Sequence, residues 1–288
     1  MSAANDPAPR ADWDGGELPV VVIEPRKGWL MIDWRELWAY RDLWLTLAAR
    51  DIKVRYKQTV LGGFWAILRP FLTMVIFTFI FQRMGRLSTD GLPGPVFYYA
   101  GLLPWTFFAA VVTGASQSLI EGARLMTKVY FPRILIPSCV LGYALIDLAL
   151  AALVFLPILW YYGVAPSREA VFLPLLAGGI VLTALGVGVL LAALNVKYRD
   201  FRYVVPFLVQ IWMFLSNVVT PASIIPKRYE RLMSLNPMAG LIEGFRNALV
   251  GRPLAWDAIG ISLGVGLFLF FFGVAYFRNV EDEFADIV

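Results

Sequence analysis

The chain has 288 residues, of which 59% are hydrophobic and only 16% are charged, and its mean hydropathy is +0.67. A soluble domain of this length needs more polar surface than the sequence supplies, so the composition indicates an integral membrane protein. Histidine is absent and Cys139 is the single cysteine, which excludes a disulfide within the chain, structural zinc and histidine acid–base chemistry. The net charge of +4 is informative mainly through its distribution, because Lys and Arg set membrane orientation.

Residues 1–28 are rich in Pro, Gly and Asp, and only the short run 18–23 has the composition of a strand. They lack the basic start, the apolar core and the cleavage site of a secretory signal. We therefore expect an extended cytoplasmic tail.

Residues 29–59 contain a predicted amphipathic helix. Its apolar face consists of Leu37, Trp44, Leu45, Ala48, Ile52 and Tyr56, and its cations are Arg50, Lys53, Arg55 and Lys57, against the single acid Asp51. This pattern is typical of a helix that lies in the headgroup plane of an anionic leaflet. The alternative is a soluble amphipathic helix packed on a core. Gly62 and Gly63 then precede the first long apolar run.

Six apolar stretches follow, and we expect each to cross about 30 Å of hydrocarbon at about 1.5 Å per residue. They cover residues 60–81, 96–119, 134–162, 172–193, 204–219 and 259–277. The fourth contains Gly178, Gly179, Gly186 and Gly188, which predict close contact with another helix. The sequence therefore predicts an all-α integral membrane fold, with a six-span domain over residues 60–288.

Positive charge lies mostly on one side of these stretches. With the amino terminus inside, the inside flanks hold Arg50, Lys53, Arg55, Lys57, Arg124, Lys128, Arg133, Lys197, Arg199, Arg202 and Arg278, whereas the short outside loops hold only Arg83, Arg86 and Arg168. This asymmetry predicts that both termini are cytoplasmic, in a bacterial inner membrane. The segment 220–254 adds further cations on the outside, and it is the exception to the pattern.

The segment between the fifth and sixth stretches contains a turn signal and a helical pattern, so we do not expect it to be an unstructured linker. Asn236 and Pro237 form a turn signal directly before residues 238–251, whose apolar positions recur at helical spacing. Glu243 and Arg246 are three residues apart, close enough to pair on such a helix. Because the helix is too short to span, we expect it to be interfacial or re-entrant, and at membrane depth it has to be buried in protein or face an aqueous cavity.

Three stretches carry a resemblance to a known family. They are RDIKVRYKQTVLGGFWAILRP at 50–70, NVKYRDFRYVVPF at 195–207 and SLNPMAGLIEGFRNALVG at 234–251. In content and spacing they resemble the membrane subunit of type-2 ATP-binding-cassette exporters, in particular the branch that exports polysaccharides such as O-antigen, capsule and teichoic acid. The resemblance covers the chain from about residue 35 to its end.

The resemblance implies a homodimer in contact with membrane lipids, together with two cytoplasmic ATP-binding-cassette subunits that hold ATP and Mg. The implied substrate is a lipid-linked polysaccharide, with O-antigen as the first candidate. The sequence has no phosphate-binding loop and no Ser/His/Asp or Cys/His set, so we expect no cofactor, metal or catalytic residue on this chain, and no nucleic acid partner. The alternatives are an exporter of drugs or small lipids, or a membrane-bound glycosyl or acyl transferase, which would need acids or histidine at a membrane face.

In the resembled family, a cytoplasmic loop lies in a cleft of the ATPase. Here that loop is 121–133, EGARLMTKVYFPR, where a short helix ended by Pro132 is expected. Glu121, Gly122, Arg124 and Lys128 are its candidate coupling residues. The alternative is that the loop's cations only enforce topology.

Aromatic side chains, which are 15% of the chain, are candidates for a sugar path. They are Tyr98, Tyr99, Trp105, Phe107 and Phe108 on the second stretch, and Trp65, Phe71, Trp212 and Phe214 on its neighbours. Flat ring faces can stack on the C–H faces of sugars without holding any one unit tightly. The alternative is an interfacial aromatic belt or helix packing.

Asp147 lies near the middle of the third stretch. A carboxylate there costs about 2.5 kcal/mol or more on insertion scales, so it has to face protein or water. It is interpreted as a structural group bonded to a neighbouring helix or a tyrosine. A proton relay or a substrate contact is the alternative.

Overall fold

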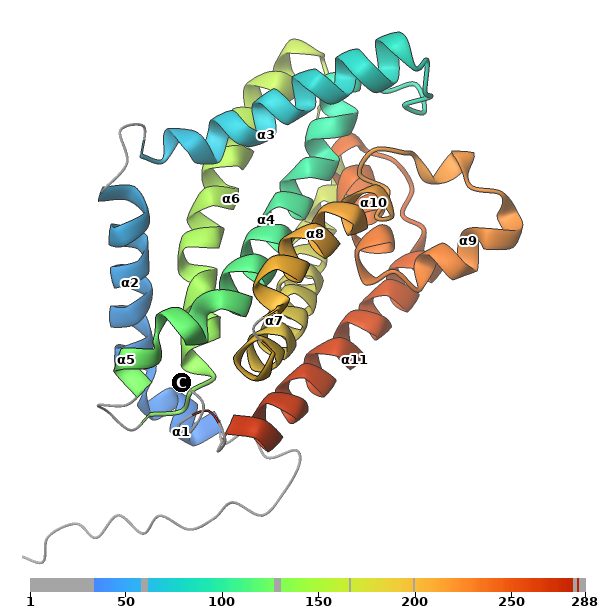
Figure 1. Ribbon diagram of the computed structural model, residues 1–288. Helices are drawn as coiled ribbons and strands as arrows, with labels where there is room; N and C mark the ends of the chain where they lie inside the picture. Colours follow the sequence, from blue (N-terminus) through green and yellow to red (C-terminus); the bar gives the residue numbers. More distant parts are fainter. Residues whose placement is uncertain are drawn as a thin grey trace, which may run out of the picture. The chain divides into compact units, whose positions relative to one another are not determined.

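The computed structural model describes residues 34–57, 62–126, 131–165, 167–198, 200–281 and 284. These residues form helices joined by turns, with no strand among them (Figure 1). The chain divides into two units, Met1–Met31 and Ile32–Val288, and every described residue belongs to the second. The predicted tail 1–28, its possible strand 18–23 and the candidate coupling residue Lys128 lie outside the described residues.

The helices follow one another along the chain with short connections. They are α1 (Trp34–Ala39), α2 (Arg41–Lys57), α3 (Phe64–Phe77) with its π-helical continuation η1 (Thr78–Met84), α4 (Gly94–Glu121), α5 (Ala123–Met126), α6 (Leu135–Tyr161), the 3-10 turn η2 (Arg168–Phe172), α7 (Leu173–Lys197), α8 (Phe201–Phe214), η3 (Ala222–Ile224), α9 (Lys227–Ser234), α10 (Pro237–Val250) and α11 (Trp256–Val280).

Five helical stretches of the described chain are long and apolar enough to cross a membrane. They are Phe64–Met84, Gly94–Glu121, Leu135–Tyr161, Arg168–Lys197 and Trp256–Val280, which matches five of the six predicted spans in position. The first begins after Gly63, where Gly62 takes a left-handed φ of 48°. Glycine reaches this conformation at little cost, so it suits the turn between α2 and α3.

The predicted fifth span is wrong in its extent. Helix α8 has 14 residues and ends at Phe214, five residues before the predicted boundary at 219. At about 1.5 Å per residue it is about 21 Å long, which is less than the hydrocarbon thickness. The chain turns away after it, because Asn217 has a φ of 55° and Pro221 follows. The six-span count therefore stays a prediction, with five spans of full length described.

Helix α4 is the most buried of the long helices and packs against α3, α6, α7 and α10. Helix α7 packs closely on α4 and α11, as its glycines predicted. A Cβ atom on Gly188 would lie 2.9 Å from the Ala115 side chain of α4, and one on Gly186 would overlap the backbone of Phe270 in α11. Gly178 has open space around it, so this glycine does not take part in the contact.

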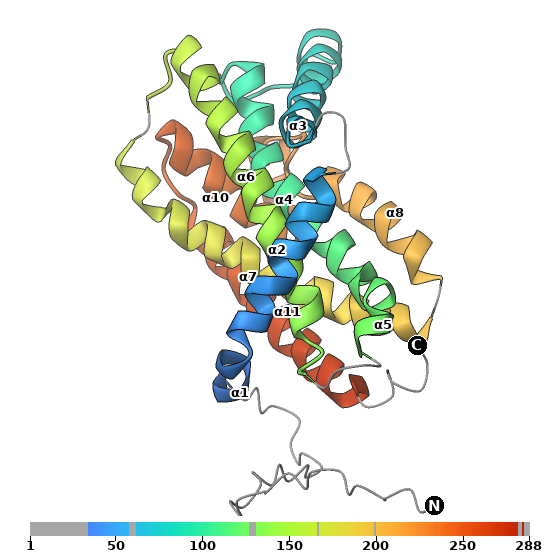
Figure 2. The same ribbon diagram turned by 90° about the vertical axis from the view of Figure 1, so that its left-hand side faces the viewer.

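Helix α2 lies along the first half of α6 in both views (Figures 1 and 2). The Trp44 Nε1–H donates to the Ser138 hydroxyl at 3.0 Å, and Ala48 is buried against Gly142. Leu45 was expected on the apolar face, but its side chain is 57% exposed. The covered face instead centres on Leu47 and Ala48, because α6 covers α2 from that side.

Candidate functional site

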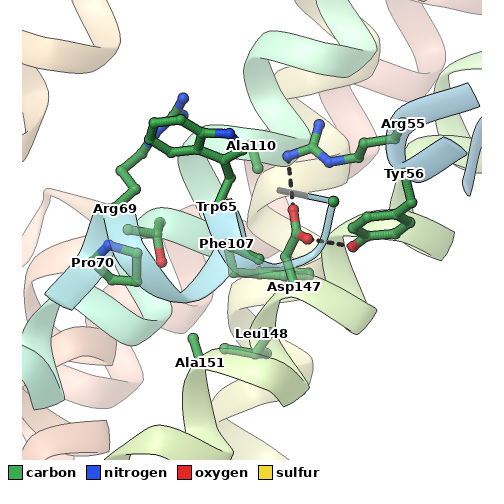
Figure 3. Close-up of a pocket in the computed structure, with 13 residues that line it drawn as sticks. Arg55, Tyr56, Trp65, Arg69, Pro70, Phe107, Ala110, Asp147, Leu148 and Ala151 are labelled. Carbon is green, nitrogen blue, oxygen red and sulfur yellow. Dashed lines mark hydrogen bonds and ion pairs between the residues drawn. The ribbon is translucent and has the colours of Figure 1, made fainter. Parts of the chain in front are cut away.

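A cavity of about 420 Å³ lies where the end of α2 meets α3, α4 and α6 (Figure 3). Its chemically distinctive lining residues are Arg55, Tyr56, Trp65, Arg69, Phe107 and Asp147. The lining combines two cations, one carboxylate and aromatic rings. It therefore gathers, in one place, residues from the predicted interfacial helix, the predicted aromatic path and the mid-span acid.

Asp147 is held by two residues of α2. The Arg55 Nη2 lies 2.7 Å from one carboxylate oxygen, and the Tyr56 hydroxyl donates to the other at 2.5 Å (Figure 3). Arg55 also stacks over the Tyr143 ring, with its Cζ 4.3 Å from the ring centroid. Burial, together with the bond to Asp147, raises the pKa of Tyr56, so its hydroxyl stays a donor. The interpretation of Asp147 as a group bonded to a neighbouring helix and a tyrosine is confirmed.

The predicted path aromatics separate into two groups. The five on α4, namely Tyr98, Tyr99, Trp105, Phe107 and Phe108, are at most 4% exposed. Tyr99 stacks on Phe155 at 5.2 Å between ring centroids, and Phe108 meets Trp212 edge to face at 5.1 Å. Rings buried in this way contact mainly the chain itself, which is the packing alternative, and Phe107 in addition lines the cavity.

The other aromatics lie at the surface of the described chain. The side chains of Trp65 and Phe214 are each 50% exposed and that of Phe71 is 38% exposed, whereas Trp212 is only partly covered. Among the predicted path residues, these have ring area free to meet a ligand, lipid or another chain. Their role in a sugar path stays a prediction.

Helix α10, the predicted re-entrant or interfacial segment, is buried in protein. Asn236 is its N-cap, and its side-chain oxygen accepts both the Met238 N–H and the Trp212 Nε1–H. Pro237 occupies the first turn, where its missing N–H costs nothing. The Ser262 hydroxyl of α11 donates to the Asn236 carbonyl at 3.0 Å and accepts the Gly240 N–H. These contacts satisfy backbone groups that hydrocarbon would leave unpaired.

Arg246 of α10 is 1% exposed, and each of its three guanidinium nitrogens donates at least one hydrogen bond. It pairs with Glu243 at 2.9 Å, as predicted, and donates to the carbonyls of Phe97, Asn217 and Val218. Its guanidinium also lies over the Phe97 ring, 3.8 Å from the centroid. Desolvation lowers the pKa of Arg246, and Glu243 opposes this effect. The group is a cross-link between α4, α10 and the turn after α8.

The candidate coupling residues Glu121, Gly122 and Arg124 lie around the junction of α4 and α5, where Glu121 and Arg124 are exposed. A short helix, α5, begins in this loop at Ala123 and is described as far as Met126. The predicted continuation to Pro132 crosses residues 127–130, which lie outside the described residues. After the loop, the Arg133 N–H donates to Glu281 at 2.9 Å, so the start of α6 is tied to the end of α11.

The cations of α2 have different surroundings. Arg50, Lys53 and Lys57 are exposed, and Arg50 pairs with its neighbour Asp51 at 2.8 Å. Arg55 alone among the four reaches into the cavity, where it binds Asp147. The α2 surface therefore divides into an open cationic side and a side committed to α6.

Three residues with a place in these contacts were not predicted, namely Arg69, Ser262 and Asn217. Arg69 carried a usable signal, because it is a cation within an otherwise apolar run. Ser262 and Asn217 carried no such signal in the sequence, because their hydrogen bonds join segments that only the fold brings together.

The sequence matches the ABC-2 type transporter family over residues 42–250. This chain therefore belongs to that family, and it is a membrane component of an ABC transporter. The prediction of a transport subunit rather than an enzyme is confirmed.

Within this family the chain is similar to polysaccharide transport proteins. The O-antigen export system permease protein RfbA of Klebsiella pneumoniae is 29% identical over 248 residues, which is 86% of this chain and 95% of the relative. The protein of the same name from Myxococcus xanthus is 29% identical over 257 residues, covering 88% and 98% of the two chains. The polysialic acid transport protein KpsM of Escherichia coli is 25% identical over 244 residues, covering 82% and 92%.

Proposed function

We propose that this chain is the permease subunit of an ATP-driven exporter that moves a lipid-linked polysaccharide, O-antigen in the first place, across the bacterial inner membrane. The observation that carries the proposal is the similarity to two O-antigen export permeases along nearly their whole length. The similarity to a polysialic acid transporter supports the broader class of polysaccharide substrates. Export runs from the cytoplasm outward, with both termini inside, as the distribution of Lys and Arg indicates.

The working unit in this proposal is a homodimer with two cytoplasmic ATPase subunits, which carry ATP and Mg. Helices α3 and α8 support a dimer, because they expose large apolar side chains such as Leu72, Phe207 and Leu208. We assign this exposed apolar surface in part to a second copy and in part to lipid. The conduit then forms between the two copies, since aromatic side chains of the same chain pack around α4.

Deletion of the gene in its source organism tests the proposal. The mutant is expected to lose the surface polysaccharide and to accumulate the lipid-linked glycan on the cytoplasmic face of the inner membrane. An added glycosidase should then digest this glycan only after the cells have been permeabilised. A plasmid copy should restore export, and a copy truncated after residue 214 serves as the control. Normal surface polysaccharide in the deletion strain, with altered efflux of a drug or small lipid instead, would contradict the proposal.

A further inference from the structure

Arg69 is a cation placed within an apolar membrane helix. It lies five residues from the start of α3, whose length and composition suit a membrane span. A cation at such a position is costly in hydrocarbon and typically faces protein, water or a headgroup. Its side chain is exposed and has no hydrogen bond or ion pair with any residue that the structure describes.

The cavity gives Arg69 a specific setting. Trp65 precedes it by four residues, so both side chains lie on the same face of α3, and both line the cavity (Figure 3). Across the cavity, Arg55 is oriented by Asp147 and Tyr143. Because Asp147 offsets only one of the two guanidiniums, the lining keeps an excess of positive charge.

The surroundings of the cavity are amphipathic. On one side α2 contributes Arg55 and Tyr56 to the lining, and on the other α3 exposes Leu72 and further apolar side chains. A ligand that fits this junction has an anionic head for the guanidiniums and an apolar chain for the α3 surface. Arginine forms bidentate hydrogen bonds to phosphate oxygens, which makes a phosphoryl group the best-matched head.

We propose that this cavity binds the phosphoryl head of a lipid, with Arg69 and Arg55 on the phosphate oxygens and the lipid chain along α3. Two sources share this chemistry, namely the phosphate-linked carrier of the exported glycan and an anionic membrane phospholipid. The inference rests on the proposed function only for the first source. A cation that merely extends to the headgroup region would bind no particular lipid.

Binding of radiolabelled geranylgeranyl diphosphate to the purified full-length chain in detergent tests the proposal. Arg69→Gln is expected to weaken binding about tenfold, equivalent to about 1.4 kcal/mol, because one charged partner is removed. Arg69→Lys, which keeps the charge and loses the bidentate geometry, should give an intermediate loss. Arg83→Gln is the matched control, since Arg83 is an exposed arginine on the same continuous helix outside the cavity. It should bind as the wild type does.

Competition with unlabelled compounds separates the sources. Competition by phosphatidylglycerol as strong as that by geranylgeranyl diphosphate assigns the site to a membrane phospholipid, and weak competition assigns it to the glycan carrier; both support the proposal. Equal competition by geranylgeraniol, which has no phosphate, or by inorganic diphosphate, which has no lipid chain, would overturn it. Unchanged affinity in Arg69→Gln would also overturn it.

Loss of this site and loss of the proposed function are distinguishable. If the wild type exports polysaccharide while Arg69→Gln binds normally, the phosphoryl site is wrong and the exporter stands. If binding depends on Arg69 but the deletion strain still exports its glycan, the exporter proposal fails and the site stands.

Discussion

At the scale of single residues, the fold depends on charged groups that the protein itself neutralises. Arg246 has almost no contact with solvent, yet its guanidinium meets one carboxylate and three backbone carbonyls. Gly101 of α4 makes room for this group, because a Cβ at that position would lie 2.5 Å from the Arg246 Nη2. A buried cation is tolerated only when its partners are complete.

Gly101→Ala is therefore expected to destabilise the protein by about 1–3 kcal/mol, which is the usual cost of overpacking. A lower melting temperature in detergent would show it. Gly178→Ala is the matched control, since it also lies in a long helix but has open space around it. That control should be neutral or slightly stabilising, because alanine favours helix. Equal melting temperatures for the two variants would contradict the role given to Gly101.

Tyr56→Phe should destabilise the protein by about 1–2 kcal/mol, because the Asp147 carboxylate loses a hydrogen-bond donor. Since the pKa of Tyr56 is raised in the folded state, this contribution is complete below the ordinary tyrosine pKa of about 10 and is lost only as the pH rises further. Tyr203→Phe, at a residue that is 78% exposed, is the control. Equal melting temperatures of Tyr56→Phe and Tyr203→Phe at pH 7 would show that the hydrogen bond does not contribute to stability.

At the scale of elements, α2 has two sides with different partners. One side is covered by α6 from Ser138 to Asp147, and the other presents Arg50, Lys53 and Lys57. Because α2 follows the direction of α6, an interfacial position for α2 requires the first half of α6 to be inclined or to lie at headgroup level. The leaflet-parallel orientation of α2 remains a prediction.

Replacing Arg50, Lys53 and Lys57 together by Glu should lower membrane levels or assembly. Each cation near an anionic leaflet contributes about 1 kcal/mol of attraction, which the substitution turns into repulsion. Arg55 is left intact because it binds Asp147. The triple Gln variant, which removes the attraction without adding repulsion, should have a smaller effect. Normal membrane-fraction levels and export in the Glu variant would argue against contact with the leaflet.

Glu121→Lys tests the loop after α4 as the coupling element. Glu121 is exposed, so the change should leave folding and insertion intact while weakening co-purification with the ATPase subunit. A bulky substitution at Gly122 would disturb the fold as well as the loop surface, because an added Cβ would lie 3.0 Å from the Ser118 carbonyl oxygen and 3.3 Å from the Ile136 side chain. Asp257→Lys, at the exposed start of α11, is the control. Undiminished association and transport in Glu121→Lys would direct attention to α2 instead.

At the scale of the whole molecule, the unequal burial of the long helices indicates where another chain fits. Helix α4 is enclosed, whereas α3 and α8 keep exposed apolar faces. Aromatics of the same chain pack against much of α4, which favours a polymer path outside a single subunit. The proposed homodimer places the path between two subunits.

In a Cys139→Ala background, Phe207→Cys on α8 should give a cross-linked dimer with a short bis-maleimide, whereas Trp160→Cys on α6 should not. Trp160 is 85% exposed and Phe207 is 63% exposed, so the reagent reaches the control position at least as easily. A stronger cross-link at Phe207→Cys therefore has to come from proximity between the two copies. Gel mobility in native membranes measures the result. Cross-linking at both positions or at Trp160 alone would place the interface elsewhere.

The sequence by itself determined the class, the positions of five spans and the pairing of Glu243 with Arg246. These features depend on composition, local periodicity and neighbours in one helix, which are visible along the chain. It could not determine that α8 ends at Phe214, because a turn within an apolar run leaves hydropathy unchanged.

Only the tertiary structure decided which groups meet. Arg55 and Asp147 are 92 residues apart in the chain, and Arg246 reaches the carbonyl of Phe97 across 149 residues. It also decided that the aromatics of α4 are buried whereas Trp65 is exposed. Burial depends on which helices pack together, and a large aromatic side chain on a membrane helix can face either lipid or protein.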